Sequence, residues 1–323
     1  MRFLSFAKVN LHLEVLRRRG DGFHDLRTIF QTIDLADEIE LSLEPLGRAP
    51  SAVVGLAVEG APGLPADESN LAWRAAARFL AAWGRPGEGV RLRLKKCIPI
   101  GGGLGGGSAN AATVLLGLSA LLERHPGPLP LAEMAAELGS DVPFFLQGGT
   151  ALGTGRGEQL EWLPDPAASP LDLWLAVPPV VVATSAVFSA HRVAAASGEG
   201  ATPVGEGESE PVASARRALA ATGESAAVPA AWSPLLGWND LEPTCLALYP
   251  AVRDVYNRLS ESGAVAVRLS GSGSTIFALF ADREAGEVVG ARLGSETVWL
   301  PVQTLSRTEW RRRTGLFAQS GGS

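Results

Sequence analysis

The sequence predicts a two-domain globular fold that contains both strands and helices. The chain has 323 residues, which favours two hydrophobic cores rather than one. Hydrophobic residues make up 46% of the chain and charged residues 19%, a composition typical of folded domains. Short alternating segments that indicate strands are mixed with longer apolar runs that indicate helices.

The first half of the chain predicts four or five strands and a capped helix. Apolar and polar residues alternate over residues 7–15, with Lys8, Asn10, His12 and Glu14 on the polar side. This pattern predicts a strand with one buried face. Taken alone, its polar face is better explained by contact with solvent than by a ligand. Further strands are expected at residues 28–33, 38–43, 52–58 and 90–94, with a helix over residues 71–83 between an Asn70 cap and Gly84.

The second half predicts a boundary, an insert and a strand-rich domain. We expect a helix at residues 131–138, then a turn and strand at residues 148–155, so the domains are predicted as 1–153 and 154–307. Residues 194–231 are rich in Ala, Gly, Ser, Glu and Pro and read as a low-complexity insert with one short helix at most. Strands are expected at residues 171–177, 265–269, 275–280 and 298–305, and a helix at residues 251–260. Residues 308–323 are expected to form a flexible tail.

Six glycines within seven residues are the most unusual feature of the chain. They occupy positions 101–107, between the strand at residues 90–94 and an apolar helical run at residues 111–122. Glycine loses more backbone freedom on folding than any other residue, so the cluster needs a reason. Close approach of bare backbone N–H groups to a phosphate, with a helix N-terminus behind them, supplies one. The hydroxyl of Ser108 can cap that helix or reach a phosphate or its metal.

Three interpretations of the glycine cluster compete. A flexible linker is disfavoured because the glycines lie between a strand and a helix. Gly101, Gly103 and Gly106 satisfy the dinucleotide pattern G-x-G-x-x-G, but the acidic residue at the required spacing, Glu123, ends a helix rather than a strand. A nucleoside triphosphate loop remains, and it is not a Walker loop because no lysine follows the glycines.

The stretch from Pro99 to Ala112 closely resembles the phosphate loop of the GHMP kinases. That family also has an N-terminal strand such as residues 7–13 and a C-terminal Gly-Ser-Gly turn, here Gly271, Ser272 and Gly273. Residues 21–24 (Asp-Gly-Phe-His) and 139–145 resemble the branch of the family that acts on 4-diphosphocytidyl-2-C-methyl-D-erythritol. The resemblance covers nearly the whole chain outside the insert and the tail.

This resemblance implies an α+β fold of two domains and an activity. The N-terminal domain is expected to be similar to ribosomal protein S5 domain 2, and the C-terminal domain to be ferredoxin-like. The enzyme is expected to move the γ-phosphoryl of ATP, with Mg²⁺, to the 2-hydroxyl of the substrate in non-mevalonate isoprenoid biosynthesis. ATP contacts are expected from Pro99, Ile100, Gly101, Gly102, Gly103, Leu104, Gly105, Gly106, Gly107, Ser108 and Ala109. No dedicated protein metal site is expected.

The resemblance also implies roles for residues outside the loop. Asp141 matches the catalytic acid residue of the family and Lys8 its catalytic lysine. A base such as Asp141 typically contributes 10²–10⁴ in rate, and Lys8 either orients it or stabilises the transferring phosphoryl. Read alone, Asp141 is better explained as a helix N-cap, with Pro143 in the first turn. The expected substrate contacts are Asn10, Phe23, His24, Phe30, Thr184, Phe188, Gly271, Ser272 and Gly273. Phe23 replaces a family tyrosine, so a ring can stack on cytosine but the phenol is lost.

Charge and cysteine content limit the binding partners and the cellular compartment that the sequence predicts. The net charge of −6 gives no basic footprint for nucleic acid, so an anionic substrate has to be held by local groups. Two distant cysteines and the absence of a leader-like or membrane-spanning apolar run suit a cytoplasmic protein. We expect small-molecule partners only, and a monomer or weak homodimer. Alternatives are another GHMP kinase, a non-catalytic nucleotide-binding protein on the same fold, and a dinucleotide oxidoreductase.

Overall fold

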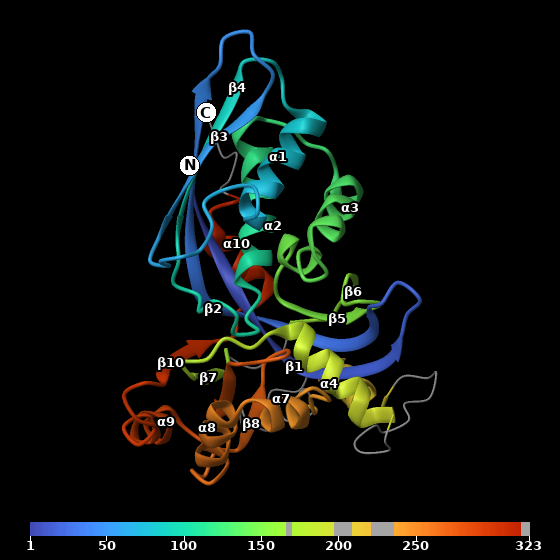
Figure 1. Ribbon diagram of the computed structural model, residues 1–323, viewed down its shortest axis with the longest axis vertical. Helices are drawn as coiled ribbons and strands as arrows, with labels where there is room; N and C mark the ends of the chain where they lie inside the picture. Colours follow the sequence, from blue (N-terminus) through green and yellow to red (C-terminus); the bar gives the residue numbers. More distant parts are fainter. Residues whose placement is uncertain (166–169, 197–208, 221–235, 318–323) are drawn as a thin grey trace.

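The structure, a computed structural model, contains two sheets that lie one above the other in Figure 1. It describes residues 1–165, 170–196, 209–220 and 236–317. The first sheet has six strands in the order β3-β4-β2-β5-β6, with β1 paired to β2, and the second has four in the order β10-β7-β9-β8. Helices α1, α2 and α3 pack on one side of the first sheet, as Figure 1 shows.

The first sheet is organised around two long antiparallel strands. These are β1 (Arg2–Arg18) and β2 (His24–Pro45), which pair along almost their whole length. The upper part of β2 also pairs with β4 (Glu88–Lys95), which is parallel to β3 (Ala52–Glu59), and its lower part pairs with β5 (Thr150–Thr154). The segments expected at residues 28–33 and 38–43 are therefore one continuous strand. Both faces of β1 are buried, so the predicted solvent-facing side is wrong.

The helices of the first domain follow their sequence signals. Helix α1 (Leu71–Trp83) begins at Asn70, whose side chain accepts a hydrogen bond from the backbone N–H of Ala72, as expected for an N-cap. Helices α2 (Gly106–Leu121) and α3 (Pro128–Leu138) complete this layer. Their apolar side chains and those of the sheet form one continuous core around Phe79, Leu92 and Leu115.

Two predicted boundaries differ from the structure. Strand β6 (Gln159–Trp162) pairs with β5, so the first sheet continues past the predicted boundary at residue 153. The predicted flexible tail is wrong for α10 (Arg307–Thr314), which Ser306 caps. Trp310 of this helix is 2% exposed and packs with Phe6 and Leu305. One buried tryptophan anchors the helix, and because its neighbours in the sequence are polar, the sequence does not indicate a packed helix here. Residues 318–323 lie outside the described part of the chain.

The second sheet has the ferredoxin-like arrangement. Its strands β7, β8, β9 and β10 are all antiparallel to their neighbours, and their order makes the first strand central and the last one an edge. A β-α-β-β-α-β succession produces this order. The bounds are β7 (Asp172–Val177), α4 (Thr184–Ala196), α5 (Glu210–Ala220), α7 (Glu242–Leu248), α8 (Pro250–Ser260), β8 (Ala266–Leu269), β9 (Ile276–Leu279), α9 (Arg283–Gly290) and β10 (Val298–Gln303).

The structure describes part of the predicted insert at residues 194–231. Its first residues end α4, and α5 matches the single short helix that was expected. Val212 and Ala215 of α5 are buried in the core between the two sheets. Residues 197–208 and 221–235, which hold most of the insert, lie outside the described part of the chain.

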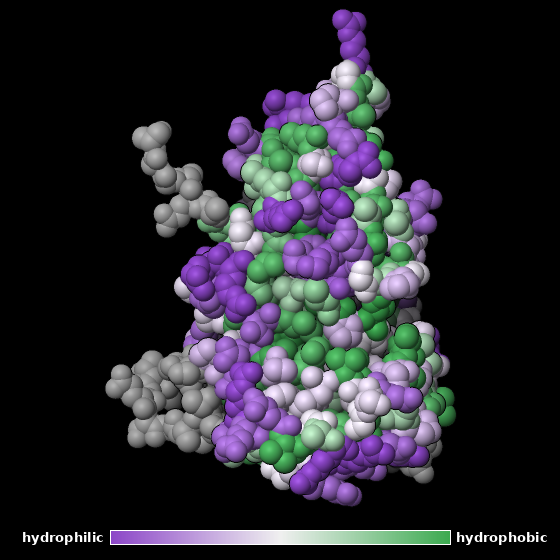
Figure 2. Space-filling view, turned by 90° about the vertical axis from the view of Figure 1, so that its left-hand side faces the viewer, coloured by the Kyte–Doolittle hydropathy of each residue, from purple (hydrophilic) through white to green (hydrophobic). Residues whose placement is uncertain are grey.

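The side of the molecule shown in Figure 2 has a mixed surface. On the side of the molecule shown in Figure 2, hydrophilic residues are interspersed with hydrophobic ones. Exposed ion pairs join neighbouring strands of the first sheet, including Arg2 with Glu40 and Lys95 with Glu38. Within the described residues, no helix is both long and apolar enough to cross a bilayer.

Candidate active site

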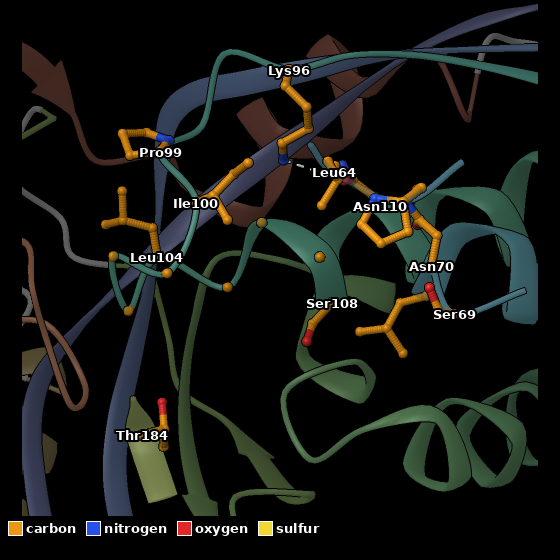
Figure 3. A pocket seen from close by; sticks show the side chains of 18 residues that line it. Leu64, Ser69, Asn70, Lys96, Pro99, Ile100, Leu104, Ser108, Asn110 and Thr184 are labelled. Atoms are coloured by element: carbon orange, nitrogen blue, oxygen red, sulfur yellow. Dashed lines mark hydrogen bonds between the residues drawn. The ribbon is translucent and has the colours of Figure 1, made fainter. Parts of the chain in front are cut away.

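The glycine loop lines a cavity of about 520 Å³ at the start of α2. Every residue from Pro99 to Ser108 contributes to its wall, together with Lys96, Asn70 and Thr184. Figure 3 shows the loop side chains beside Ser108 and Lys96. Ala109 is buried in the helix and does not line the cavity. The first N–H groups of a helix have no partner inside the helix, so the start of α2 offers donors to an anion in this cavity.

The glycines also allow the second domain to approach the loop. Gly103 has a φ of 74°, and a Cβ there would lie 2.1 Å from the carbonyl oxygen of Ser270. A Cβ on Gly102 would lie 2.5 Å from Oγ1 of Thr275, whose backbone N–H donates to the Gly102 carbonyl at 3.2 Å. The loop is thus held against the turn that joins β8 to β9. Close approach of Ser270 and Thr275 from the second domain accounts for these two glycines, alongside the predicted approach to phosphate.

Lys8 lies at the centre of the site. It extends from β1, is 3% exposed, and its ammonium donates to Asn10 Oδ1 at 2.5 Å and to the Gly103 carbonyl at 2.9 Å. The same ammonium lies 3.5 Å from Oδ2 of Asp141. Burial lowers the pKa of Lys8 below its usual value, and the Asp141 carboxylate opposes that shift. The predicted lysine and carboxylate therefore form a pair beside the glycine loop.

Asn10 is oriented by its second hydrogen bond. Its amide nitrogen donates to Oγ1 of Thr28 at 2.8 Å, and that hydroxyl donates to the His12 carbonyl at 2.7 Å. The amide oxygen is left facing Lys8. Gly271 completes the enclosure, because a Cβ at that position would lie 3.2 Å from Oδ1 of Asn10. The polar side of β1 is thus covered by the second domain.

Asp141 does not serve as a helix cap. It follows α3, and the N-cap residue of the short helix η1 (Pro143–Leu146) is Val142, which makes no side-chain cap hydrogen bond. The Asp141 side chain is 32% exposed and faces Lys8. It also lines a second cavity of about 550 Å³. A carboxylate with one lysine partner and an open side can accept a proton from a bound alcohol.

The second cavity, which we call the acceptor cavity, is rich in rings. Phe23, His24 and Phe188 line it, and the rings of His24 and Phe188 stack at 5.2 Å and 22°. Phe23 is 52% exposed. Burial lowers the pKa of His24, and positive charge from His191 and two arginines adds to that effect. His24 is therefore neutral at neutral pH and can both donate and accept hydrogen bonds.

Thr184 joins the two cavities. It begins α4, lines both the glycine-loop cavity and the acceptor cavity, and its hydroxyl lies 2.8 Å from that of Ser272. Gly271, Ser272 and Gly273 line neither cavity, so the turn supports the site from behind. Phe30 also lines neither. It is buried below Lys8, whose ammonium lies 5.6 Å from the ring centre.

Comparison with known proteins accounts for this geometry. A model of the GHMP kinases N terminal domain matches residues 70–149, and one of the GHMP kinases C terminal region matches residues 226–298. A 4-diphosphocytidyl-2-C-methyl-D-erythritol kinase of Pelotomaculum thermopropionicum is 41% identical over 90% of this chain and 92% of its own. The chain belongs to the GHMP kinase family.

Other relatives give the same result. The Moorella thermoacetica protein of the same name is 42% identical over 90% of this GHMP kinase and 93% of its own length. A crystal structure of 4-(cytidine 5'-diphospho)-2C-methyl-D-erythritol kinase is 36% identical, with a TM-score of 0.70 over 94% of this chain and 99% of that one. A homoserine kinase of Cytophaga hutchinsonii, at 22% identity and a TM-score of 0.63 over 95% of both chains, shares the fold.

Sequence reasoning missed one buried cluster of this GHMP kinase. The carboxylate of Asp37 on β2 accepts hydrogen bonds from the backbone N–H groups of Cys97 and Ile98 at 2.7 and 2.8 Å. It also accepts from Nδ2 of Asn110 at 2.8 Å and contacts the Lys96 ammonium. The cluster fixes the entrance of the glycine loop and the first turns of α2. The sequence signal was Asn110 within the loop motif and Lys96 just before it.

Proposed function

We propose that this kinase transfers the γ-phosphoryl of ATP to the 2-hydroxyl of 4-diphosphocytidyl-2-C-methyl-D-erythritol, a step of isoprenoid precursor biosynthesis. One observation carries the proposal. The Lys8–Asp141 pair lies between the glycine-loop cavity and the ring-lined acceptor cavity, and Thr184 lines both cavities. A nucleotide in the first cavity and an alcohol in the second would meet at this pair. The curated relatives carry the name of the same reaction.

The acceptor cavity supports a nucleotide-linked alcohol over a small one. Its volume of about 550 Å³ is in the range of cavities that bind drug-sized ligands. Phe23 and Phe188 offer flat faces to a pyrimidine, and neutral His24 offers hydrogen bonds to its edge. Mevalonate or homoserine would leave these rings without a partner. Phe23 can stack as a tyrosine does, although it provides no hydroxyl.

Asp141 acts as the base in the proposed reaction. The proton of the 2-hydroxyl passes to the Asp141 carboxylate while the alcohol oxygen bonds to the γ-phosphorus. The bond from that phosphorus to the bridging oxygen breaks, and ADP leaves. Lys8, 3.5 Å from Asp141, either orients this base or stabilises the transferring phosphoryl. Phosphoryl transfer depends mostly on such positioning and charge stabilisation.

The glycine loop and α2 would bind the phosphates of ATP. The described residues contain no cluster of three or more His, Cys, Asp or Glu side chains that would hold a metal. Ser108 is the residue at the loop that would contact Mg²⁺, and the phosphates would supply the other oxygen ligands, which suits this cation. When bound, Mg²⁺ offsets the phosphate charge.

A substrate panel tests the proposal. ADP release is measured with Mg-ATP and, separately, 4-diphosphocytidyl-2-C-methyl-D-erythritol, homoserine and mevalonate. We expect turnover of the cytidyl substrate alone. Turnover of another alcohol would overturn the roles given to Phe23, His24 and Phe188. No turnover despite ATP binding would favour a non-catalytic nucleotide-binding protein.

A further inference from the structure

The acceptor cavity carries more positive charge than the protein as a whole. Among the residues that line it, three have an acidic or strongly basic side chain, namely Asp141, Arg156 and Arg192. Asp141 already has Lys8 as its partner. The cavity wall thus holds two arginines in a chain whose net charge is −6. These arginines can attract an anion into the cavity, and the proposed roles of Lys8 and Asp141 do not use them.

Arg156 lies along the wall between the two ends of this cavity. It belongs to the hairpin that joins β5 to β6, and the neighbouring Gly157 would place a Cβ 4.0 Å from Oδ1 of Asp141. The guanidinium carbon of Arg156 lies 5.1 Å from the ring centre of Phe23. Arg156 therefore spans the wall from the proposed base to the aromatic residues.

Backbone hydrogen bonds of the hairpin hold Arg156 in place. The backbone N–H of Leu26 donates to the Gly155 carbonyl at 2.6 Å, and the backbone N–H of Arg156 donates to Glu158 at 2.6 Å. Nε of Arg156 forms an ion pair with the Glu158 carboxylate at 3.7 Å, which is longer than a hydrogen bond. The Arg156 side chain is 28% exposed and lines the cavity, so its other guanidinium N–H groups can reach a ligand there.

We propose that Arg156 binds the diphosphate of the acceptor substrate. The inference rests on the proposed function, in which the substrate hydroxyl lies at Asp141 and its ring lies at Phe23 and Phe188. The diphosphate joins these two parts, so it must pass along the wall that Arg156 occupies. A planar guanidinium matches phosphate oxygens with two parallel hydrogen bonds, which a lysine does not.

Arg192 is less well placed for this role. Thr184, Phe188 and Arg192 lie four residues apart on the same face of α4, and all three line the cavity. Arg192 is therefore about 12 Å along the helix from Thr184, at the rise of 1.5 Å per residue. Phe188 lies between them. This places Arg192 beyond the ring end, away from the base, where it donates to Ser189 Oγ at 3.2 Å.

Binding measurements with two ligands isolate the contribution of the diphosphate to substrate affinity. Cytidine and cytidine 5'-diphosphate are titrated by calorimetry into the protein while a non-hydrolysable ATP analogue fills the glycine-loop cavity. For Arg156→Gln we expect about a 10- to 100-fold weaker affinity for the diphosphate, as for loss of hydrogen bonds to a charged group. Its affinity for cytidine should stay unchanged. Arg156→Lys should fall between, and Arg17→Gln, on the exposed β1–β2 hairpin outside the cavity lining, should bind like wild type.

Several results would overturn the inference. These are unchanged diphosphate affinity in Arg156→Gln, an equal loss for cytidine and its diphosphate, or a loss in Arg192→Gln in place of Arg156→Gln. Kinetics distinguish this inference from the proposed function. If wild type binds the diphosphate through Arg156 but does not phosphorylate the cytidyl substrate, the proposed function fails alone. If wild type turns that substrate over and Arg156→Gln leaves its KM unchanged, the assignment of Arg156 fails alone.

Discussion

The Asp37 cluster predicts a large loss of stability when one buried carboxylate oxygen is replaced by an amide. In Asp37→Asn, one oxygen can still accept from the N–H groups of Cys97 and Ile98. The new amide nitrogen would face two other donors, Nδ2 of Asn110 and the Lys96 ammonium. Lys96 would be left buried and unpaired. Breaking such a pair costs about 3–5 kcal/mol, which lowers Tm by roughly 5–10 °C in a chain of this size.

The adjacent ion pair provides a matched control. Glu38 pairs with Lys95 at 2.8 Å, one residue along each strand, but both side chains are about half exposed. Pairs in solvent contribute little, so Glu38→Gln should leave Tm within about 2 °C of wild type. Thermal unfolding of both variants is measured together with KM for ATP, which should rise only in Asp37→Asn. Equal Tm values for the two variants would refute the role given to this cluster.

The remaining predictions concern the loop, the last helix and pH. Gly103→Ala should lower Tm and raise KM for ATP, because the added Cβ would lie 2.1 Å from a carbonyl oxygen. In the control Gly107→Ala the nearest atom is 3.6 Å away, so Tm should not change. Equal Tm values for the two variants would contradict this account. Trp310→Ala should cost about 3–5 kcal/mol in denaturant unfolding, and Phe317→Ala, which is largely exposed, much less. Burial lowers the pKa of Lys8 below the usual 10.5, and the proposed reaction requires the charged ammonium, so kcat should begin to fall below pH 10.5 as the pH is raised. A kcat that stays constant up to pH 10.5 would argue against the role of Lys8.

Local signals in the sequence predicted much of the fold. The cap at Asn70, the strand before the glycine loop, and the strand-turn-strand at residues 266–279 are all present. Each depends on neighbouring residues, which a sequence shows directly. The α+β class and the ferredoxin-like second domain came from the family resemblance, and both are confirmed. Strand order depends on contacts between distant segments, which periodicity does not reveal.

The parts that sequence reasoning missed depend on tertiary contacts. The polar side of β1 looks like a solvated face until the turn after β8 covers Asn10. The Asp37 carboxylate is remote in sequence from the loop that it holds, as its hydrogen bond to the N–H of Ile98 shows. The burial of Phe30 beside the Lys8 ammonium is also a tertiary contact, and its expected contact with substrate stays a prediction. The roles of Lys8 and Asp141 remain predictions that the geometry supports.

The base assignment is tested most directly by one variant. Asp141→Asn keeps the size of the side chain and removes its capacity to accept the hydroxyl proton. The measurement is kcat with saturating Mg-ATP and 4-diphosphocytidyl-2-C-methyl-D-erythritol, with Tm and ATP affinity as checks on folding. We predict a loss of about 10²–10⁴ in kcat, with Tm and ATP affinity close to wild type. A near-normal kcat in a folded Asp141→Asn protein would contradict the account.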